Sequence, residues 1–194
     1  MSTFTQRCSF VLTLMIASAA VSLAADAPAP IGKSSHDTAA PLLDQLKSAK
    51  DTAEAMMLES KVWQAWMTSG DAKIDEMVQK ANTLMQFSMF DDSLAILDSV
   101  VAKAPNYAEG WNRRATLLYM MQEYNRSLAD IRQVLALEPR HFGAISGLGM
   151  ISMVKGDKAG ALSAYKKVLE IDPQNPSAKA SVEQLDKELS GNPI

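Results

Sequence analysis

The sequence predicts an all-α protein, a short α-solenoid of helix–turn–helix repeats with a degenerate helix pair before them and a capping helix after them. Three observations lead to this prediction. The chain repeats itself with a period of 34 residues, apolar residues recur three and four apart inside each copy, and a proline lies near the end of each copy. Proline ends a helix because it lacks an N–H group and restricts the residue before it.

The repeat is clearest between residues 108–141 and 142–175, which align without a gap. A weaker copy precedes them at residues 74–107. Because Asp71 is predicted to cap its first helix, we take this first repeat as residues 71–107. Large, small and proline positions match in the two clear copies: Trp111 with Ile145, Ala115 with Gly149, Ser127 with Ala161, Ile131 with Tyr165, and Pro139 with Pro173. Small residues let the two helices of a repeat approach, and large ones fill the space between repeats, so stacking buries what one repeat cannot.

This pattern resembles the tetratricopeptide repeat (TPR) family, which places a Trp-like residue at position 4, small residues at 8 and 20, and proline at 32. The resemblance covers three consecutive copies and implies two antiparallel helices per repeat. One departure is position 7, usually Leu, which is Lys80 and Arg114 in the first two copies. Because one fold can serve many functions, the resemblance predicts the fold more strongly than the function.

The N-terminus, residues 1–24, has the features of a signal peptide. Arg7 precedes an uncharged apolar run, and small residues at Ser22 and Ala24 fit a cleavage site near Ala24 or Ala25. An uncleaved membrane anchor is the alternative. Cleavage would remove Cys8, the single cysteine, and we expect export to the bacterial periplasm. The remaining 18 Lys and Arg against 22 Asp and Glu make nucleic acid an unexpected partner.

Residues 25–40 are rich in Pro, Ala and Ser, and we predict a disordered linker in which His36 has no role. Residues 41–70 then predict a helix pair that begins at Pro41 and divides near Lys50, where Asp51 can cap the second helix. One long helix is the alternative. The pair is interpreted as a degenerate repeat that serves as an N-terminal cap. Its two tryptophans are expected to pack against Met77, Ala81 and Leu84 of the first repeat. An exposed aromatic binding site at Trp63 and Trp66 is the alternative.

Residues 176–190 predict an amphipathic C-terminal capping helix, since a solenoid needs a half-polar end for solubility. Its charged residues are interpreted as a solvated face.

Little in the sequence indicates catalysis. A triad or metal site needs several converging groups, and the predicted folded part has one histidine, His141, which we interpret as a turn or cap residue. No cofactor is expected. Met150 and Met153 lie three apart, but two thioethers do not make a copper site. The sequence therefore predicts a protein that is not an enzyme.

The resemblance implies a concave groove along the first helix of each repeat, where TPR proteins hold a partner's peptide or helix. Carried onto this chain, the groove consists of Asn82, Met85, Gln86, Asn112, Arg113, Thr116, Tyr119, Met120, Ser146, Met150 and Met153. The family's carboxylate clamp, which grips an acidic C-terminus, is not matched. Its positions hold Val78, Asn82, Arg113, Gly143 and Gly147, of which only Asn82 fits.

The favoured hypothesis is a non-catalytic protein–protein interaction module in the periplasm, serving cell-envelope assembly or integrity. Two alternatives are an accessory factor that handles a cofactor or metal, for cytochrome maturation or metal delivery, and a cell-wall hydrolase. We also expect Arg113 to face the groove. Arg114 should lie on the packed side beside a carboxylate such as Asp130 or Glu109.

Overall fold

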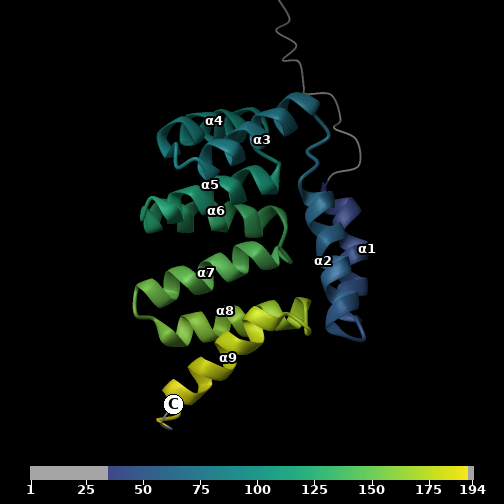
Figure 1. Ribbon diagram of the computed structural model, residues 1–194, viewed down its shortest axis with the longest axis vertical. Coiled ribbons are helices and arrows are strands. Elements are labelled where there is room, and N and C mark those ends of the chain that lie inside the picture. Colours follow the sequence, from purple (N-terminus) through teal and green to yellow (C-terminus); the bar gives the residue numbers. More distant parts are fainter. Residues whose placement is uncertain (1–34, 192–194) are drawn as a thin grey trace, which may run out of the picture.

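The computed structural model describes residues 35–191, which form nine α-helices and no strand. Most of these helices stack as antiparallel pairs, and one pair stands beside the stack (Figure 1). The predicted signal peptide and residues 25–34 of the predicted linker lie outside the described residues. The helices are α1 (Ser35–Lys47), α2 (Thr52–Trp66), α3 (Ala72–Gln86), α4 (Phe90–Lys103), α5 (Ala108–Met120), α6 (Tyr124–Leu137), α7 (Phe142–Val154), α8 (Lys158–Ile171) and α9 (Pro176–Leu189).

The three predicted repeats are the pairs α3–α4, α5–α6 and α7–α8, and each pair packs on the next. Predicted caps begin several of these helices. Asp71 accepts the backbone N–H of Lys73, and Asp157 accepts that of Gly160, both at 2.8 Å. Such caps satisfy N–H groups that have no partner inside the helix. The all-α solenoid is therefore confirmed.

The turn inside each repeat uses the same backbone conformation. Ser88, Gln122 and Gly156 have φ values of 59°, 61° and 77°, and they occupy the same position in the three repeats. This left-handed conformation favours glycine, so only the third repeat has the residue that fits it without strain. The turn geometry is thus more regular than the sequence that forms it.

Helices α1 and α2 form a hairpin, as the division near Lys50 predicts. Asp51 caps α2 by accepting the N–H of Glu54 at 2.8 Å, and the Glu54 carboxylate accepts the N–H of Lys50 at 2.8 Å. The predicted linker boundary is wrong, because α1 begins at Ser35 rather than Pro41, and Pro41 lies inside the helix. Burial of Ala39 and Leu43 on the same helix offsets the backbone hydrogen bond that proline removes.

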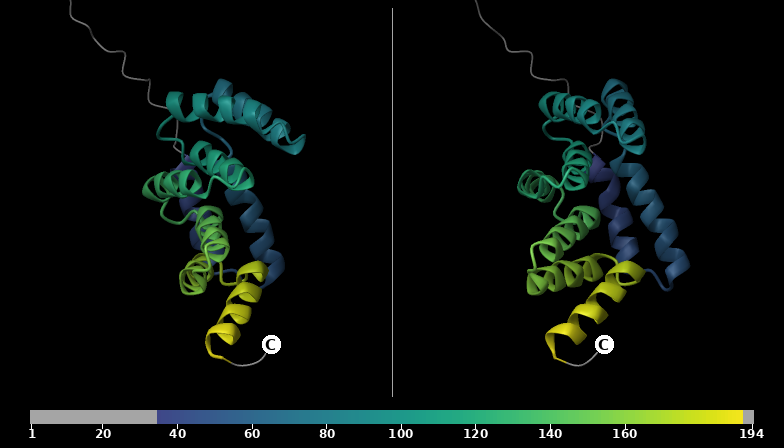
Figure 2. Two further views of the ribbon diagram at one scale, coloured as in Figure 1. Left: turned by 90° about the vertical axis from the view of Figure 1, so that its left-hand side faces the viewer. Right: turned by 60° about the vertical axis from the view of Figure 1, so that its left-hand side comes forward.

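The hairpin does not stack on the first repeat, which overturns the predicted N-terminal cap. It runs alongside the stack, across the ends where α6 meets α7 and α8 meets α9 (Figures 1 and 2). Trp66 stacks on His141 with ring centres 4.0 Å apart and lies 5.0 Å from the ring of Phe142. Trp63 meets the same two rings edge-on at 5.6 and 5.4 Å. Both tryptophans therefore pack on the third repeat, not on Met77, Ala81 and Leu84.

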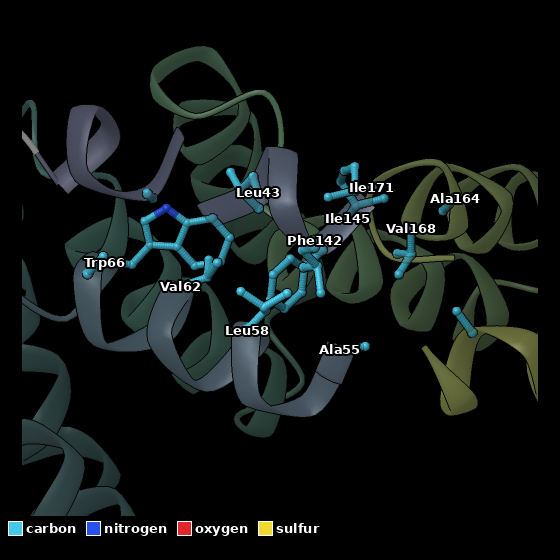
Figure 3. Packing of buried hydrophobic residues seen from close by; sticks show 14 residues of the cluster. Leu43, Ala55, Leu58, Val62, Trp66, Phe142, Ile145, Ala164, Val168 and Ile171 are labelled. Atoms are coloured by element: carbon cyan, nitrogen blue, oxygen red, sulfur yellow. The ribbon is translucent and has the colours of Figure 1, made fainter. Parts of the chain in front are cut away.

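A large apolar cluster joins the hairpin to the third repeat and α9 (Figure 3). Its buried members come from five helices, α1, α2, α7, α8 and α9: Ala39, Leu43, Leu46, Ala55, Leu58, Val62, Ala65, Trp66, Phe142, Ile145, Ala164, Val168, Ile171 and Ala178. Burying one large apolar side chain contributes about 1.5–3 kcal/mol, so this cluster is a major part of the protein's stability.

The first repeat explains why the hairpin is free to pack elsewhere. In the second repeat, Arg114 and Leu117 face the preceding helix pair, and the matching residues of α3 are Lys80 and Thr83. Both are exposed, as is Glu76 on the same face. A polar outer face needs no preceding repeat to cover it, so α3 itself ends the solenoid.

The C-terminal helix α9 caps the other end as predicted. Pro176 starts it, Asn175 caps it through the N–H of Ala178, and Leu185 is buried against the stack. Within the described residues, no helix is both long and apolar enough to cross a membrane.

Candidate partner-binding groove

The predicted groove residues lie on one face of α3, α5 and α7, but they differ in accessibility. Those near the C-terminal ends of the three helices are exposed or partly exposed. Met120, Met150 and Met153 are 45%, 41% and 36% exposed, and the side chains around them are polar or aromatic. We call this set the methionine strip, which consists of Asn82, Met85, Gln86, Thr116, Tyr119, Met120, Met150 and Met153.

A small pocket of about 50 Å³ opens in the methionine strip between α5 and α7. Its walls include Thr116, Tyr119 and Met150, and Gly147 opens it because a glycine has no side chain. Apart from Asn112, Thr116, Tyr119 and Ser127, the lining is apolar, and none of it is charged. The pocket can therefore receive a small apolar group from a partner.

The hairpin covers the other half of the predicted groove. A Cβ on Gly143 would lie 2.5 Å from Cη2 of Trp63, so the ring rests directly on the first turn of α7. The guanidinium of Arg113 lies 5.8 Å from the centre of the Trp63 ring, and its Nη2 donates to Sδ of Met67 at 3.3 Å. Arg113 therefore faces the hairpin, and the prediction that it faces an open groove is wrong.

The side chains of two further predicted groove residues make hydrogen bonds within the protein. Asn112 is 7% exposed, and its Nδ2 donates to the Glu109 carboxylate at 2.9 Å. Ser146 is partly buried and donates its hydroxyl to the backbone oxygen of Phe142 at 2.9 Å. Of the eleven predicted residues, Asn112, Arg113 and Ser146 thus lie outside the methionine strip.

A buried polar cluster lies beneath the hairpin and was missed by sequence reasoning. The Nε2 of His141 lies 3.0 Å from Oε2 of Glu109, and its Nδ1 accepts the N–H of Ala144 at 3.1 Å. This pattern assigns the ring proton to Nε2, which donates to the carboxylate. His141 is therefore a helix cap, as predicted, and it also orients Glu109.

Glu109 remains ionised although it is fully buried. Burial alone would raise its pKa, but the hydrogen bond from His141 and the charge of Arg113 outweigh burial, so its pKa lies below the ordinary value. Arg113 forms an ion pair with it one helical turn away. The cluster has no nucleophile beside the histidine, and it fits a structural role.

Arg114 lies on the packed side, as predicted. Its Nε and Nη2 bond to both carboxylate oxygens of Asp130 at 2.8 Å, and its Nη1 bonds to Asp98 at 2.8 Å. The guanidinium also lies over Trp111, 4.9 Å from the ring centre. The hydrogen bond with Asp130 is the main reason that the pKa of Arg114 is raised. Arg114 thus links the first and second repeats.

More apolar side chains are exposed at this edge than the family pattern implies. Phe87 is 73% exposed, Met89 47% and Val154 50%. All three lie at or just beyond the C-terminal ends of α3 and α7, beside the methionine strip. Their positions at the repeat turns could have identified them. Among residues 35–191, no group of three or more His, Cys, Asp or Glu side chains could hold a metal ion.

Comparison with known proteins identifies the family. Residues 113–176 match the family model described as tetratricopeptide repeat. A TPR repeat-containing protein of Rhizobium etli is 38% identical over 151 residues, which cover 78% of this chain and 74% of that protein. The Hsp70-Hsp90 organizing protein of Triticum aestivum is 29% identical over 61% of this chain, but the match spans 20% of that longer protein.

Solved structures share the fold at low sequence identity. The first TPR domain of Spaghetti, bound to the HSP90 peptide SRMEEVD, superposes with a TM-score of 0.58 at 18% identity, covering 62% of this chain and 96% of that one. MamA protein superposes with a TM-score of 0.56 at 20% identity over 81% of this chain and 83% of its own. TPR proteins act as scaffolds that bind other proteins. With the repeat geometry and the Rhizobium etli relative together, this chain belongs to the tetratricopeptide repeat family.

Proposed function

We propose that this protein is a non-catalytic protein–protein interaction module that holds an apolar helix or peptide of a partner on the methionine strip. The observation that carries the proposal is the concentration of exposed apolar side chains on one edge of the groove. Six of the nine exposed large apolar residues in the described chain are Phe87, Met89, Met120, Met150, Met153 and Val154. Contiguous exposed apolar surface marks binding sites, and methionine adapts to varied shapes.

The ligand we propose differs from the HSP90 peptide that the Spaghetti domain binds. An acidic C-terminus needs cations along the groove. At the clamp positions of this chain, Val78 is buried, Gly143 lies under Trp63, and Arg113 is already paired with Glu109. A partner with an uncharged apolar face therefore fits this surface better than a terminal carboxylate.

The test is to compare partner recovery by matched variants of the protein. The double substitution Met150→Glu with Met153→Glu places charge on the methionine strip, where it should abolish recovery of a specific partner from an envelope extract. Met57→Glu is the control, because Met57 is 54% exposed on α2, outside the groove. Equal recovery by both variants would remove the methionine strip as the binding surface.

We further propose that the protein is exported to the periplasm and serves cell-envelope assembly or integrity. The support is the sequence of residues 1–24, with its basic start, apolar run and small residues before Ala25. Cell fractionation with N-terminal sequencing of the recovered protein tests this. A mature protein that starts near Ala25 or Asp26 in the periplasmic fraction is expected, and an intact Met1 in the cytoplasm would contradict it.

A further inference from the structure

Two buried carboxylates of the solenoid face the hairpin at equivalent places. Glu138 and Asp172 occupy the same repeat position, each just before the proline that ends a repeat, and they are 1% and 0% exposed. Glu138 meets α1 of the hairpin, and Asp172 meets α2. Such residues are seldom buried without a partner, so the groups that the hairpin presents to them decide how strongly it is held.

The contact at Asp172 requires a proton. The Glu59 carboxyl lies within hydrogen-bonding reach of Asp172 and accepts from Nδ2 of Asn175 at 2.8 Å. When both carboxyls are ionised neither can donate, and Oδ2 of Asp172 is then buried without a partner. A proton on Glu59 supplies the missing donor. Burial is the main reason that the pKa of Glu59 rises to about 7, followed by the bond to Asp172 and its charge.

The contact at Glu138 fixes the start of α1. Nδ1 of His36 lies 2.8 Å from Oε2 of Glu138. Two other charged groups, Arg140 and Asp44, pair with each other beside it, and Arg140 also donates to the backbone oxygen of Ala40.

We propose that the α1–α2 hairpin is a pH-responsive clasp, held on the third repeat and α9 more tightly in weak acid than above neutral pH. Deprotonation of Glu59 weakens the contact with Asp172, since it removes the donor and places a second negative charge beside a buried carboxylate. The apolar cluster around Trp66 remains at every pH, so the hairpin opens more often rather than separating. Opening uncovers Phe142 and Ile145, which are 4% and 2% exposed when it is closed.

Hydrogen exchange of the full chain tests the clasp without any partner. Protection of α1 and α2 amides is measured relative to α5 and α6 amides in the same sample, after correction for the intrinsic exchange rate at each pH. We expect relative protection of the hairpin to fall at least tenfold between pH 5.5 and 8, because the pKa of Glu59 rises from 4.5 to about 7 and each unit of that difference corresponds to a factor of ten. No difference between the two pH values would overturn the proposal.

Variants separate the clasp from a general loss of stability. Glu59→Gln keeps a donor beside Asp172 at every pH, so at pH 8 its hairpin should be more protected than that of the natural protein, a gain that misfolding cannot produce. Glu76→Gln is the control, because Glu76 is exposed on α3 and takes no part in the contact with Asp172. If Glu59→Gln and Glu76→Gln behave alike at pH 8, the proposal is wrong.

Discussion

Replacing Gly143 by alanine should loosen the hairpin, because this glycine makes room for Trp63. The added methyl group would lie 2.5 Å from Cη2 and 3.0 Å from Cζ2 of the ring, well inside normal contact. The ring is wedged between Phe142, His141 and Trp66, so it cannot move without disturbing them. Extra methyl groups in packed sites usually destabilise by about 1–3 kcal/mol, and we expect a loss in that range.

Gly147→Ala is the matched control one turn along the same helix. Its Cβ would approach only Cδ1 of Ile131, at 3.3 Å, a flexible end that can shift. Alanine inside a helix is favoured over glycine by about 0.5–1 kcal/mol, so this variant should be neutral or slightly stabilised. Urea unfolding measures both free energies. A Gly143→Ala protein as stable as Gly147→Ala, or a loss unchanged by adding Trp63→Leu, would refute the proposed contact.

Four further predictions concern the two arginines, the buried carboxylate Glu109 and the groove. Arg114→Ala should lower the free energy of unfolding by about 2–4 kcal/mol, because it leaves Asp130 buried and unpaired, and calorimetry that finds no loss would contradict this. Arg113→Ala should also destabilise, since it removes a counter-charge from Glu109; unchanged stability with weaker partner binding would restore the open-groove interpretation. The pKa of Glu109 is lowered, so the ionised carboxylate stabilises the fold above about pH 4.5, and this stabilisation is lost as pH falls further. Glu109→Gln should therefore make the melting temperature less sensitive to acid. Tyr119→Ala should weaken partner binding with little change in melting temperature, because the side chain is only partly buried, and the reverse result would make it a core residue.

The repeats could be predicted from the sequence because their periodicity is local. Each helix start, turn and proline depends on residues within one repeat, and the second and third copies share the pattern closely. Arg114 was also predictable, since a cation at a packed position needs a nearby carboxylate and Asp130 lies on the facing helix.

The position of the hairpin could not be predicted in the same way. Its contacts join residues about a hundred positions apart, such as His36 with Glu138 and Asn175 with Glu59. No sequence period places these pairs together. The available signal was that Glu76, Lys80 and Thr83 are all polar, because a preceding repeat would need apolar residues such as Leu117 on this face. The same signal would have indicated that Trp63 and Trp66 do not pack against the first repeat.

The hairpin also explains which groove residues were assigned wrongly. Asn112 and Arg113 lie at family groove positions, but Asn112 bonds to Glu109 and Arg113 contacts the hairpin. A feature from another part of the chain, Trp63 on Gly143, covers that half of the surface. Complementarity between a large ring and a missing side chain is a property of the folded structure that neither residue indicates alone.

Site-specific photo-crosslinking in cells tests the central claim, that the methionine strip is the partner-binding surface. Photo-reactive residues replace Thr116 and Met150 on the strip, and Gln133 on the exposed face of α6 as the control. One dominant protein captured from both strip positions and absent from Gln133 is the predicted result. Capture of nothing from the strip, or of the same mixture at all three positions, would contradict the claim.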